Sequence, residues 1–361
     1  MSERVEGKPL KGRGAVSNPA GRFERFRVVP PEDGAPAPDE EAPPLPTVVT
    51  PEITRTILAH NDSPDVPFDV SINPYKGCEH GCVYCFARPT HAYLGLSPGI
   101  DFETRIVSKP EAPEALAREL RKPGYRCSAI ALGANTDPYQ PVERELGITR
   151  RILEVLQDHR HPVSVVTKSS LILRDLDLLA PMAEQGLSHV YFSVTTLDGD
   201  LARRMEPRAP APARRIEAMR AVAAAGIPVG VLASPMIPAL NDAELERILE
   251  ASAGAGARWA NYILIRLPHE VKEIFSGWLQ VHEPTRAGHV LSLIRQMHGG
   301  RLYDPGFGER MRGTGPYAQL LRQRFEVACR RLGLNETRPT LDTRRFRIPP
   351  RRGSQGSLFP R

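Results

Sequence analysis

The sequence has few cysteines, few aromatic residues and no long apolar segment. Its 361 residues include five Cys, and Phe, Trp and Tyr together make up 6%. No apolar run approaches the roughly 20 residues that cross a bilayer, and the first residues lack the apolar core of a secretory signal. A low, odd cysteine count argues against a disulfide-stabilised secreted domain. We therefore expect a cytoplasmic globular protein with no membrane partner.

The net charge of +6 is concentrated near the C-terminus. Residues 338–361 contain seven Arg and one acidic residue, Asp342, so the rest of the chain is formally neutral. A basic tail of this kind suits a polyanion such as nucleic acid, although a solvated charge run that aids solubility has the same composition. The tail therefore suggests a partner without proving one.

The composition divides the chain into four parts. Residues 1–65 hold little periodic apolar sequence and a Pro-rich stretch, which favours a largely disordered arm. Residues 66–267 alternate between apolar strands and helical segments, and residues 268–335 are mainly helical in pattern. Residues 336–361 form the basic, flexible tail.

Residues 66–267 repeat a strand and a helix six times. The predicted strands are 68–73, 128–133, 163–166, 189–194, 228–233 and 260–265. Helices are predicted at 111–121 and 148–158, and three more are expected to end at Gly186, Gly226 and Gly254 as left-handed C-caps. Near-continuous apolar strands predict a parallel sheet covered by helices, as a barrel or an open doubly wound sheet. In either fold, ligands bind at the C-terminal ends of the strands.

Three of the five cysteines, Cys78, Cys82 and Cys85, lie within eight positions of one another. Their loop follows the first predicted strand directly. A structural zinc site needs four protein ligands, and His80 or His91 could complete one. A cubane iron–sulfur cluster held by three thiolates instead leaves one iron open to a small molecule.

The pattern Cys-x3-Cys-x2-Cys, with Tyr84 before the last cysteine and a βα repeat around it, resembles the radical SAM superfamily. The resemblance implies a partial (β/α)6 barrel, with a helical C-terminal extension and flexible termini here. It also implies a 4Fe-4S cluster on the three cysteines and S-adenosylmethionine (SAM) on the open iron. One electron, from a donor such as flavodoxin or ferredoxin, then cleaves SAM to a 5′-deoxyadenosyl radical that abstracts hydrogen from the substrate.

Residues 61–69, 73–91 and 136–143 are similar to the bacterial radical SAM group related to spore photoproduct lyase, commonly labelled DNA repair photolyase-like. That resemblance covers residues 10–335 and implies a lyase-like enzyme of DNA repair. The lyase carries a hydrogen-donating cysteine just before an aspartate that corresponds to Asp137. Residues 132–137 hold no cysteine, and Cys127 lies too early in the sequence to take the same position without a register change. We therefore expect a different lesion or a different substrate.

The same resemblance implies residues that bind SAM. Ser193 and Thr195, at the end of the fourth strand, match the ribose site, and Arg214 would meet the SAM carboxylate through its guanidinium fork. Residues after the second strand would hold the amino group: Asn135, Asp137, Tyr139, Gln140 and Glu143. A turn built on Asp-Pro-Tyr, or a solvent-facing arginine, gives the same sequence for structural reasons alone.

Other candidates follow the cysteines and the third strand. Arg88, His91 and Tyr93 could bind substrate or relay a hydrogen atom, or else make structural hydrogen bonds; His91 and Tyr93 are the catalytic candidates. Lys168 and Arg174 suit an anionic substrate or plain solvent exposure. Residues 311–316 are either a lid over the barrel mouth or a connector.

The tail contains Gln355-Gly-Ser-Leu358-Phe359, which resembles the peptide that docks bacterial replication and repair proteins onto the DNA sliding clamp. Leu358 and Phe359 would be apolar anchors, and Gln355 would fix the register; the commoner form has Leu at the position of Gly356. Three hypotheses stay open. They are a radical SAM enzyme acting on damaged nucleic acid, a radical SAM enzyme modifying a protein, tRNA or metabolite, and a non-catalytic, metal-stabilised DNA or clamp adaptor.

Overall fold

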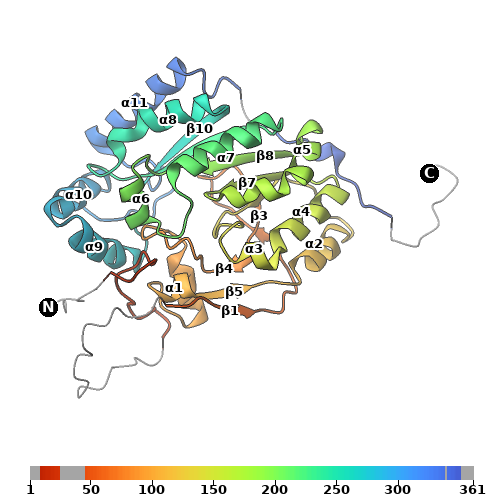
Figure 1. The fold of residues 1–361 in the computed structure, drawn as a ribbon, viewed down its shortest axis with the longest axis horizontal. Coiled ribbons are helices and arrows are strands. Elements are labelled where there is room, and N and C mark those ends of the chain that lie inside the picture. The colour runs from red at the N-terminus through yellow and green to blue at the C-terminus, as the bar shows by residue number, and fades with distance from the viewer. Residues whose placement is uncertain (1–8, 25–44, 338–339, 351–361) are drawn as a thin grey trace.

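The computed structural model describes residues 9–24, 45–337 and 340–350 (Figure 1). Its centre is a seven-stranded sheet in the order β10-β9-β8-β7-β6-β3-β2. Six strands run parallel and one, β2 (Ala59–His60), is an antiparallel edge strand. The parallel strands are β3 (Val70–Ile72), β6 (Ile130–Leu132), β7 (Val163–Thr167), β8 (Ser188–Ser193), β9 (Val229–Met236) and β10 (Ala257–Leu264). The predicted six-unit α/β fold is confirmed.

Amphipathic helices cover the outside of the sheet (Figure 1). They are α2 (Ala112–Leu120), α4 (Ile148–Asp158), α5 (Leu176–Glu184), α7 (Pro212–Ala224) and α8 (Leu245–Gly254). Gly186 and Gly226 have the expected positive φ, of 69° and 79°. Gly254 differs, because it is the last residue of α8 and the left-handed position falls at Gly256, with a φ of 96°.

Since the edge strands β10 and β2 do not pair, the barrel stays open on one side. Residues 301–314 bridge this opening. The Leu264 N–H donates to the Met311 carbonyl (2.9 Å), and the Gly308 N–H donates to Asp65 Oδ1 (2.6 Å). Arg310 forms an ion pair with the same Asp65 carboxylate. This loop therefore closes the side of the barrel.

A second, three-stranded sheet lies beside the first: β1 (Val48–Pro51), β5 (Arg105–Ser108) and β4 (Tyr75–Lys76). It corrects part of the prediction for residues 1–65, because residues 48–51 form a strand and residues 13–16 are buried. Strand β1 is held by backbone pairing with β5, and residues 14 and 15 by the Glu103 carboxylate, so these stretches carry no apolar periodicity that a sequence pattern could reveal. The short helix α1 (Asp101–Thr104) precedes β5.

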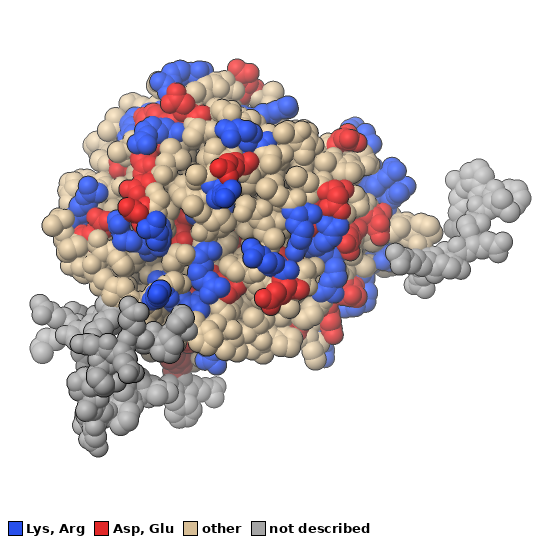
Figure 2. Space-filling model, viewed as in Figure 1, with Lys and Arg blue, Asp and Glu red and all other residues tan. Residues whose placement is uncertain are grey.

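The C-terminal part is helical as expected, with α9 (Val271–His282), α10 (Pro284–Met297) and α11 (Gly315–Arg331). The short helices α3 (Glu143–Leu146) and α6 (Gly199–Met205) lie in loops of the barrel. No helix among the described residues is long and apolar enough to cross a membrane. On the face seen in Figure 2, basic side chains are interspersed with acidic ones.

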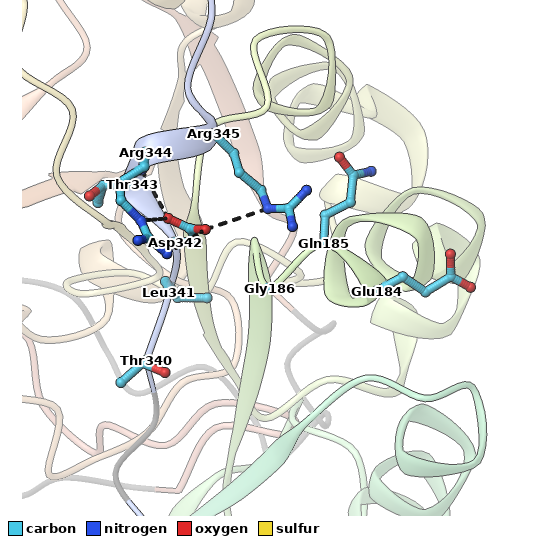
Figure 3. A pocket seen from close by; sticks show the side chains of 9 residues that line it. All are labelled: Glu184, Gln185, Gly186, Thr340, Leu341, Asp342, Thr343, Arg344 and Arg345. Carbon is cyan, nitrogen blue, oxygen red and sulfur yellow. Dashed lines mark hydrogen bonds and ion pairs between the residues drawn. The ribbon is translucent and has the colours of Figure 1, made fainter.

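Residues 340–350, which we expected to be part of a flexible tail, lie against the barrel. The Asp342 N–H donates to the Gly186 carbonyl (2.9 Å), and Phe346 packs against Tyr125 and His161, with ring centroids 5.4 Å apart in both pairs. Asp342 also pairs with Arg344, beside a shallow pocket (Figure 3). His161 and Gly186 come just before β7 and β8 in the sequence, so these contacts lie at the N-terminal ends of the strands. The clamp-like residues Gln355, Leu358 and Phe359 lie outside the described residues.

Candidate functional site

The three cysteines lie on the loop that follows β4, at the C-terminal ends of the parallel strands. Cys78 and Cys82 are buried and Cys85 is half-buried. The Cys78 N–H donates to the Phe102 carbonyl (2.9 Å), which fixes the start of the loop. The ends of β3 and β6 meet here too, because Asn73 Oδ1 accepts the Asn135 N–H (3.0 Å). The predicted position of the cysteine loop is therefore observed.

Arg88 holds the cysteine loop from within. Its fully buried guanidinium donates to the carbonyls of Gly81 (3.2 Å), Cys82 (2.9 Å) and Gly99 (2.8 Å) and forms an ion pair with Glu103. All of these contacts of the Arg88 guanidinium are with protein atoms. The sequence left two roles open for Arg88, a contact with substrate and a structural one. Its contacts in the structure are those of a structural residue.

The N-terminal segment packs directly onto the cysteine loop. The Glu103 carboxylate accepts the N–H groups of Gly14 and Ala15, both at 2.8 Å, and Arg13 donates to the Glu103 carbonyl (2.9 Å). A Cβ added at Gly14 would lie 1.8 Å from the Gly81 carbonyl oxygen. Only glycine allows the two backbones to approach this closely.

Lys168, at the end of β7, points into the site rather than into solvent. Its side chain is 13% exposed, donates to Ser193 Oγ and lies 3.5 Å from Glu206 Oε1. The ammonium also stands over the Tyr84 ring, 5.8 Å from the centroid. Burial lowers the pKa of Lys168, while the nearby thiol of Cys82 opposes that shift when ionised. Lys168 thus brings a cation close to the cysteines.

The donor set fits a cluster that spans three thiols better than it fits a single zinc ion. No three His, Cys, Asp or Glu side chains in the described ranges converge closely enough to hold one metal ion. His80 Nδ1 lies 3.4 Å from Asp137 Oδ2, and His91 Nε2 lies 3.0 Å from the Arg105 carbonyl, while His91 Nδ1 is buried without a hydrogen-bond partner. Neither histidine joins the cysteines in a group close enough to hold one metal ion among the described residues.

The three thiols need a positive partner to ionise. Burial raises the pKa of Cys78, Cys82 and Cys85, and at Cys78 the neighbouring Cys82 raises it further. Thiolate is the form that binds iron, and bound iron supplies the charge that stabilises it. The buried thiols are therefore suited to a metal cluster rather than to reactivity on their own.

Asp137 joins the ends of two strands beside the cysteine loop. Its Oδ1 accepts the Thr167 hydroxyl (2.7 Å), and its Oδ2 accepts the Lys168 N–H (2.8 Å). Burial alone would raise the pKa of the Asp137 carboxyl, but His80 and these hydrogen bonds hold it below its ordinary value. The carboxylate is thus kept ionised next to Cys78.

The other candidates after β6 brace the loop. Gln140 Oε1 accepts the Glu79 N–H (2.9 Å), and Gln140 Nε2 donates to the Gly77 carbonyl (3.2 Å). Glu143 is fully buried and pairs with Arg174 (2.7 Å). Their polar atoms are committed to the protein. A third member, Tyr139, donates to Asp175 Oδ2 (3.0 Å).

The neighbouring Arg214 and Arg215 face opposite sides of α7. The Arg214 side chain is 73% exposed and pairs with Glu217 (3.0 Å) on the outside of α7. Arg215 is buried, pairs with Glu206 and donates to the Ser193 carbonyl (3.2 Å). Because α7 begins at Pro212, successive residues rotate by about 100° and only the second arginine faces inward. The structure therefore places Arg214 on the outer face of α7, and its predicted contact with the SAM carboxylate stays a prediction.

Ser193 and Thr195 lie together at the end of β8. The Ser193 hydroxyl donates to the Ser234 carbonyl (3.2 Å), and the Thr195 hydroxyl lies within hydrogen-bond distance of two acceptors, the Ser234 carbonyl (3.0 Å) and Glu206 Oε1 (2.7 Å). Lys168 contacts the same Ser193 hydroxyl. The predicted ribose residues are therefore adjacent to the buried lysine and to the cysteine loop.

The two catalytic candidates do not lie together in the site. His91 is fully buried, its ring packs edge-on against Phe102, and burial lowers its pKa to about 4. The Tyr93 ring is 71% exposed and stacks on Phe23. Cys127 precedes β6, at the opposite end of the sheet from the cysteine loop. The structure therefore gives His91 a structural setting and Tyr93 a surface one.

Sequence reasoning missed Glu103, Glu206 and Arg215, and it left Lys168 undecided. Glu206 stands in an irregular loop, Glu103 in a single helical turn, and neither position has a local pattern that marks it. Lys168 did carry a usable signal, since it follows a buried strand at the ligand-binding end of the sheet.

The chain belongs to the radical SAM superfamily: residues 72–251 match that family. Membership implies a 4Fe-4S cluster and SAM as cofactors, and it makes the protein a radical SAM enzyme. The chain is 36% identical over 249 residues to an uncharacterized protein of Mycobacterium tuberculosis, with 68% of this chain and 72% of that one covered. It is 31% identical over 173 residues to an uncharacterized protein of Methanocaldococcus jannaschii, covering 48% and 62% of the two chains.

Among solved structures, the fold is similar to that of spore photoproduct lyase. The lyase complexed with dinucleoside spore photoproduct matches with a TM-score of 0.56 and 16% identity, over 79% of this chain and 80% of that one. A mutant of the lyase with bound AdoMet and dinucleoside spore photoproduct matches equally well. At this identity the similarity concerns the fold.

Proposed function

We propose that the protein cleaves SAM reductively at a 4Fe-4S cluster bound by Cys78, Cys82 and Cys85, in order to abstract hydrogen from a nucleic-acid lesion. The observation that carries the proposal is the buried three-thiol loop with Lys168 beside it, at the ligand-binding end of a partial barrel. Bound there, the cluster would supply the electron that cleaves the sulfonium of SAM to a 5′-deoxyadenosyl radical.

The protein's own residues bind and orient the cofactor in this proposal. Lys168 is the cation suited to the SAM carboxylate, because it contacts the Ser193 hydroxyl and lies 3.5 Å from the Glu206 carboxylate, whereas Arg215 pairs closely with Glu206. Ser193 and Thr195 would contact the ribose, and Asp137 and the backbone near Asn135 the amino group. Burial of Cys78 and Cys82 would limit the access of water to a bound cluster.

The nucleic-acid substrate is supported by the resemblance to the spore photoproduct lyase group and by the lyase structure that holds a dinucleoside photoproduct. Since residues 132–137 contain no cysteine, the hydrogen donor would differ from that of the lyase. A thiolate-bound cluster favours a reducing compartment such as the cytoplasm, with flavodoxin or ferredoxin as the electron donor. A sliding clamp would be a second partner, through Gln355, Leu358 and Phe359.

The test is anaerobic purification followed by iron and sulfide analysis and a dithionite-driven assay for 5′-deoxyadenosine. We expect about four iron and four sulfide per chain, and SAM cleavage that the Cys82→Ala variant lacks. Zinc in place of iron, with SAM left intact, would contradict the proposal and favour a metal-stabilised adaptor. Cleavage stimulated by a protein, tRNA or metabolite, but not by damaged DNA, would favour the second enzymatic hypothesis.

A further inference from the structure

Four aromatic side chains among the described residues are strongly exposed. They are Phe86 (43%), Phe23 (54%), Phe307 (59%) and Tyr93 (71%). Exposing an aromatic ring to water is unfavourable, so a group of them on one part of a surface marks a binding region.

Each exposed phenylalanine lies under an arginine. The guanidinium carbon of Arg22 is 5.6 Å from the Phe23 centroid, that of Arg266 is 5.1 Å from Phe86, and that of Arg310 is 4.5 Å from Phe307. Tyr93 stacks on Phe23, with ring centroids 5.2 Å apart and planes 27° apart. The repeated unit is thus a flat apolar ring beside a flat cation.

These units adjoin one another around the segment that follows β10. Arg266 belongs to that segment, and Glu270, four residues later, pairs with Arg22 (2.8 Å). On the other side, Arg310 pairs with Asp65, whose pKa is also lowered by nearby Arg266. We call the seven residues the Phe/Arg surface: Arg22, Phe23, Phe86, Tyr93, Arg266, Phe307 and Arg310.

The Phe/Arg surface borders the candidate catalytic centre. Phe86 follows Cys85 directly in the sequence, and Arg266 stands at the C-terminal end of β10, the end at which the cysteine loop lies. One end of this surface therefore lies next to the cysteine loop. Phe307 and Arg310 belong to the loop that bridges the barrel's open side.

We propose that the Phe/Arg surface binds a single-stranded stretch of nucleic acid, with unpaired bases stacked on Phe86 and Phe307 and phosphates near the three arginines. The proposal deepens the proposed function and rests on it only for the reaction carried out at the site. Every base has a flat face that stacks on an aromatic ring, and guanidinium groups pair with phosphate. Of the three guanidinium groups, Arg22 pairs with Glu270 and Arg310 with Asp65, while Arg266 has no carboxylate partner among the described residues.

The form of the nucleic acid follows from the exposed rings. The bases of an intact duplex are stacked on one another, so their faces are closed to protein side chains. Aromatic rings that protrude from the protein can therefore stack on bases that are already unpaired or have been turned out of the helix. A single strand is therefore expected to bind more tightly than a duplex of the same sequence.

The experiment measures fluorescence anisotropy of a fluorescein-labelled 12-nucleotide DNA, single-stranded and as a duplex, with the full chain after cluster reconstitution. The variants are Phe307→Ala, Phe86→Ala and the double substitution. The control is Val327→Ala, which removes an equally exposed apolar side chain (55%) from α11. All proteins keep the same basic tail, so its contribution cancels between variants.

We expect the double variant to bind the single strand at least tenfold more weakly than the wild type, since each lost stacked base costs about tenfold. Val327→Ala should bind normally, and duplex binding should not change. Single-strand binding by Phe307→Ala and by the double variant within twofold of the wild type would overturn the proposal. So would a ligand screen in which a peptide, but not DNA, depends on these rings.

Iron content and 5′-deoxyadenosine formation without DNA are measured on the same samples. If Phe86→Ala loses iron, Phe307→Ala decides the question, because its ring is remote in sequence from the cysteines. If the protein binds single strands but does not cleave SAM, the proposal for the Phe/Arg surface stands and the proposed function fails.

Discussion

At the residue scale, Lys168 is a largely buried cation near the thiols of Cys82 and Cys85. Replacing it by alanine leaves Ser193 and Glu206 in place but removes the positive charge. We expect SAM to bind the reconstituted Lys168→Ala protein at least tenfold more weakly, because a charge-assisted hydrogen bond to a carboxylate contributes about 1.5–3 kcal/mol. Equilibrium dialysis with labelled SAM measures this. Lys122→Ala, an exposed lysine on the outside of the barrel, is the control. Equal SAM affinity of the two variants would argue against a role for Lys168.

The two neighbouring arginines of α7 offer a matched pair. Arg215→Ala leaves the buried Glu206 carboxylate without its main cation, and we expect the free energy of unfolding to fall by about 3–5 kcal/mol. Arg214→Ala removes a side chain that is 73% exposed, and its effect should stay within about 0.5 kcal/mol. Urea unfolding of both variants measures the difference. Similar losses in the two variants would contradict the assigned orientation of α7.

This pair also shows what a single sequence reveals at the residue scale. The three cysteines were predictable, because thiols at that spacing have a narrow chemical use. Arg214 and Arg215 were not separable, since both are arginine and only the start of α7 at Pro212 decides which one turns inward. Residues that act from irregular loops, such as Glu206, have no periodicity from which to infer a direction.

At the scale of elements, the N-terminal segment is part of the cysteine site. Gly14 lies so close to Gly81 that a methyl group cannot fit between them, and Glu103 binds both the segment and Arg88. We expect Gly14→Ala to lower the free energy of unfolding by about 1–3 kcal/mol, as overpacking does, and to reduce the iron retained after gel filtration. Thermal unfolding and iron analysis measure both effects.

Gly288→Ala is the control for this substitution. Gly288 lies in α10 with no atom within 4 Å of an added Cβ, and alanine is favoured in helices, so stability should be unchanged or slightly higher. Full iron retention by Gly14→Ala would show that the segment packs on the loop without supporting it. The sequence could not predict this contact, because Gly14 and Ala15 take part through backbone N–H groups, which every residue possesses.

At the scale of the whole molecule, the order of strands and helices followed from the sequence, while the closure of the barrel did not. Strands of three to eight residues with apolar, helix-facing positions fix six parallel units. Whether the first and last strands pair depends on the tilt of the sheet and on residues 301–314, whose bridge to Asp65 joins positions more than 200 residues apart. No local pattern encodes such a contact.

Buried histidines make the stability of the whole fold depend on pH. Burial lowers the pKa of His91, His161 and His189 to about 4. In the unfolded chain each titrates near 6.5, so between about pH 6.5 and pH 4 the unfolded state binds protons that the folded state does not. The stabilisation is therefore complete above pH 6.5 and is lost as the pH falls, at up to about 1.4 kcal/mol per pH unit for each histidine.

We expect the cluster-free protein, kept reduced, to lose free energy of unfolding steeply between pH 7 and pH 5 in urea titrations. The matched variant is His161→Gln, whose amide can still bond to the Tyr125 hydroxyl that His161 Nε2 contacts at 2.7 Å but cannot take up a proton. Its stability should fall less steeply than that of the wild type, because one buried imidazole no longer titrates, while others such as His159 and His298, whose pKa values burial also lowers, still do. Parallel losses in the two proteins would mean that His161 is accessible to protons in the folded state, and that the docking of Phe346 over it does not shield the ring.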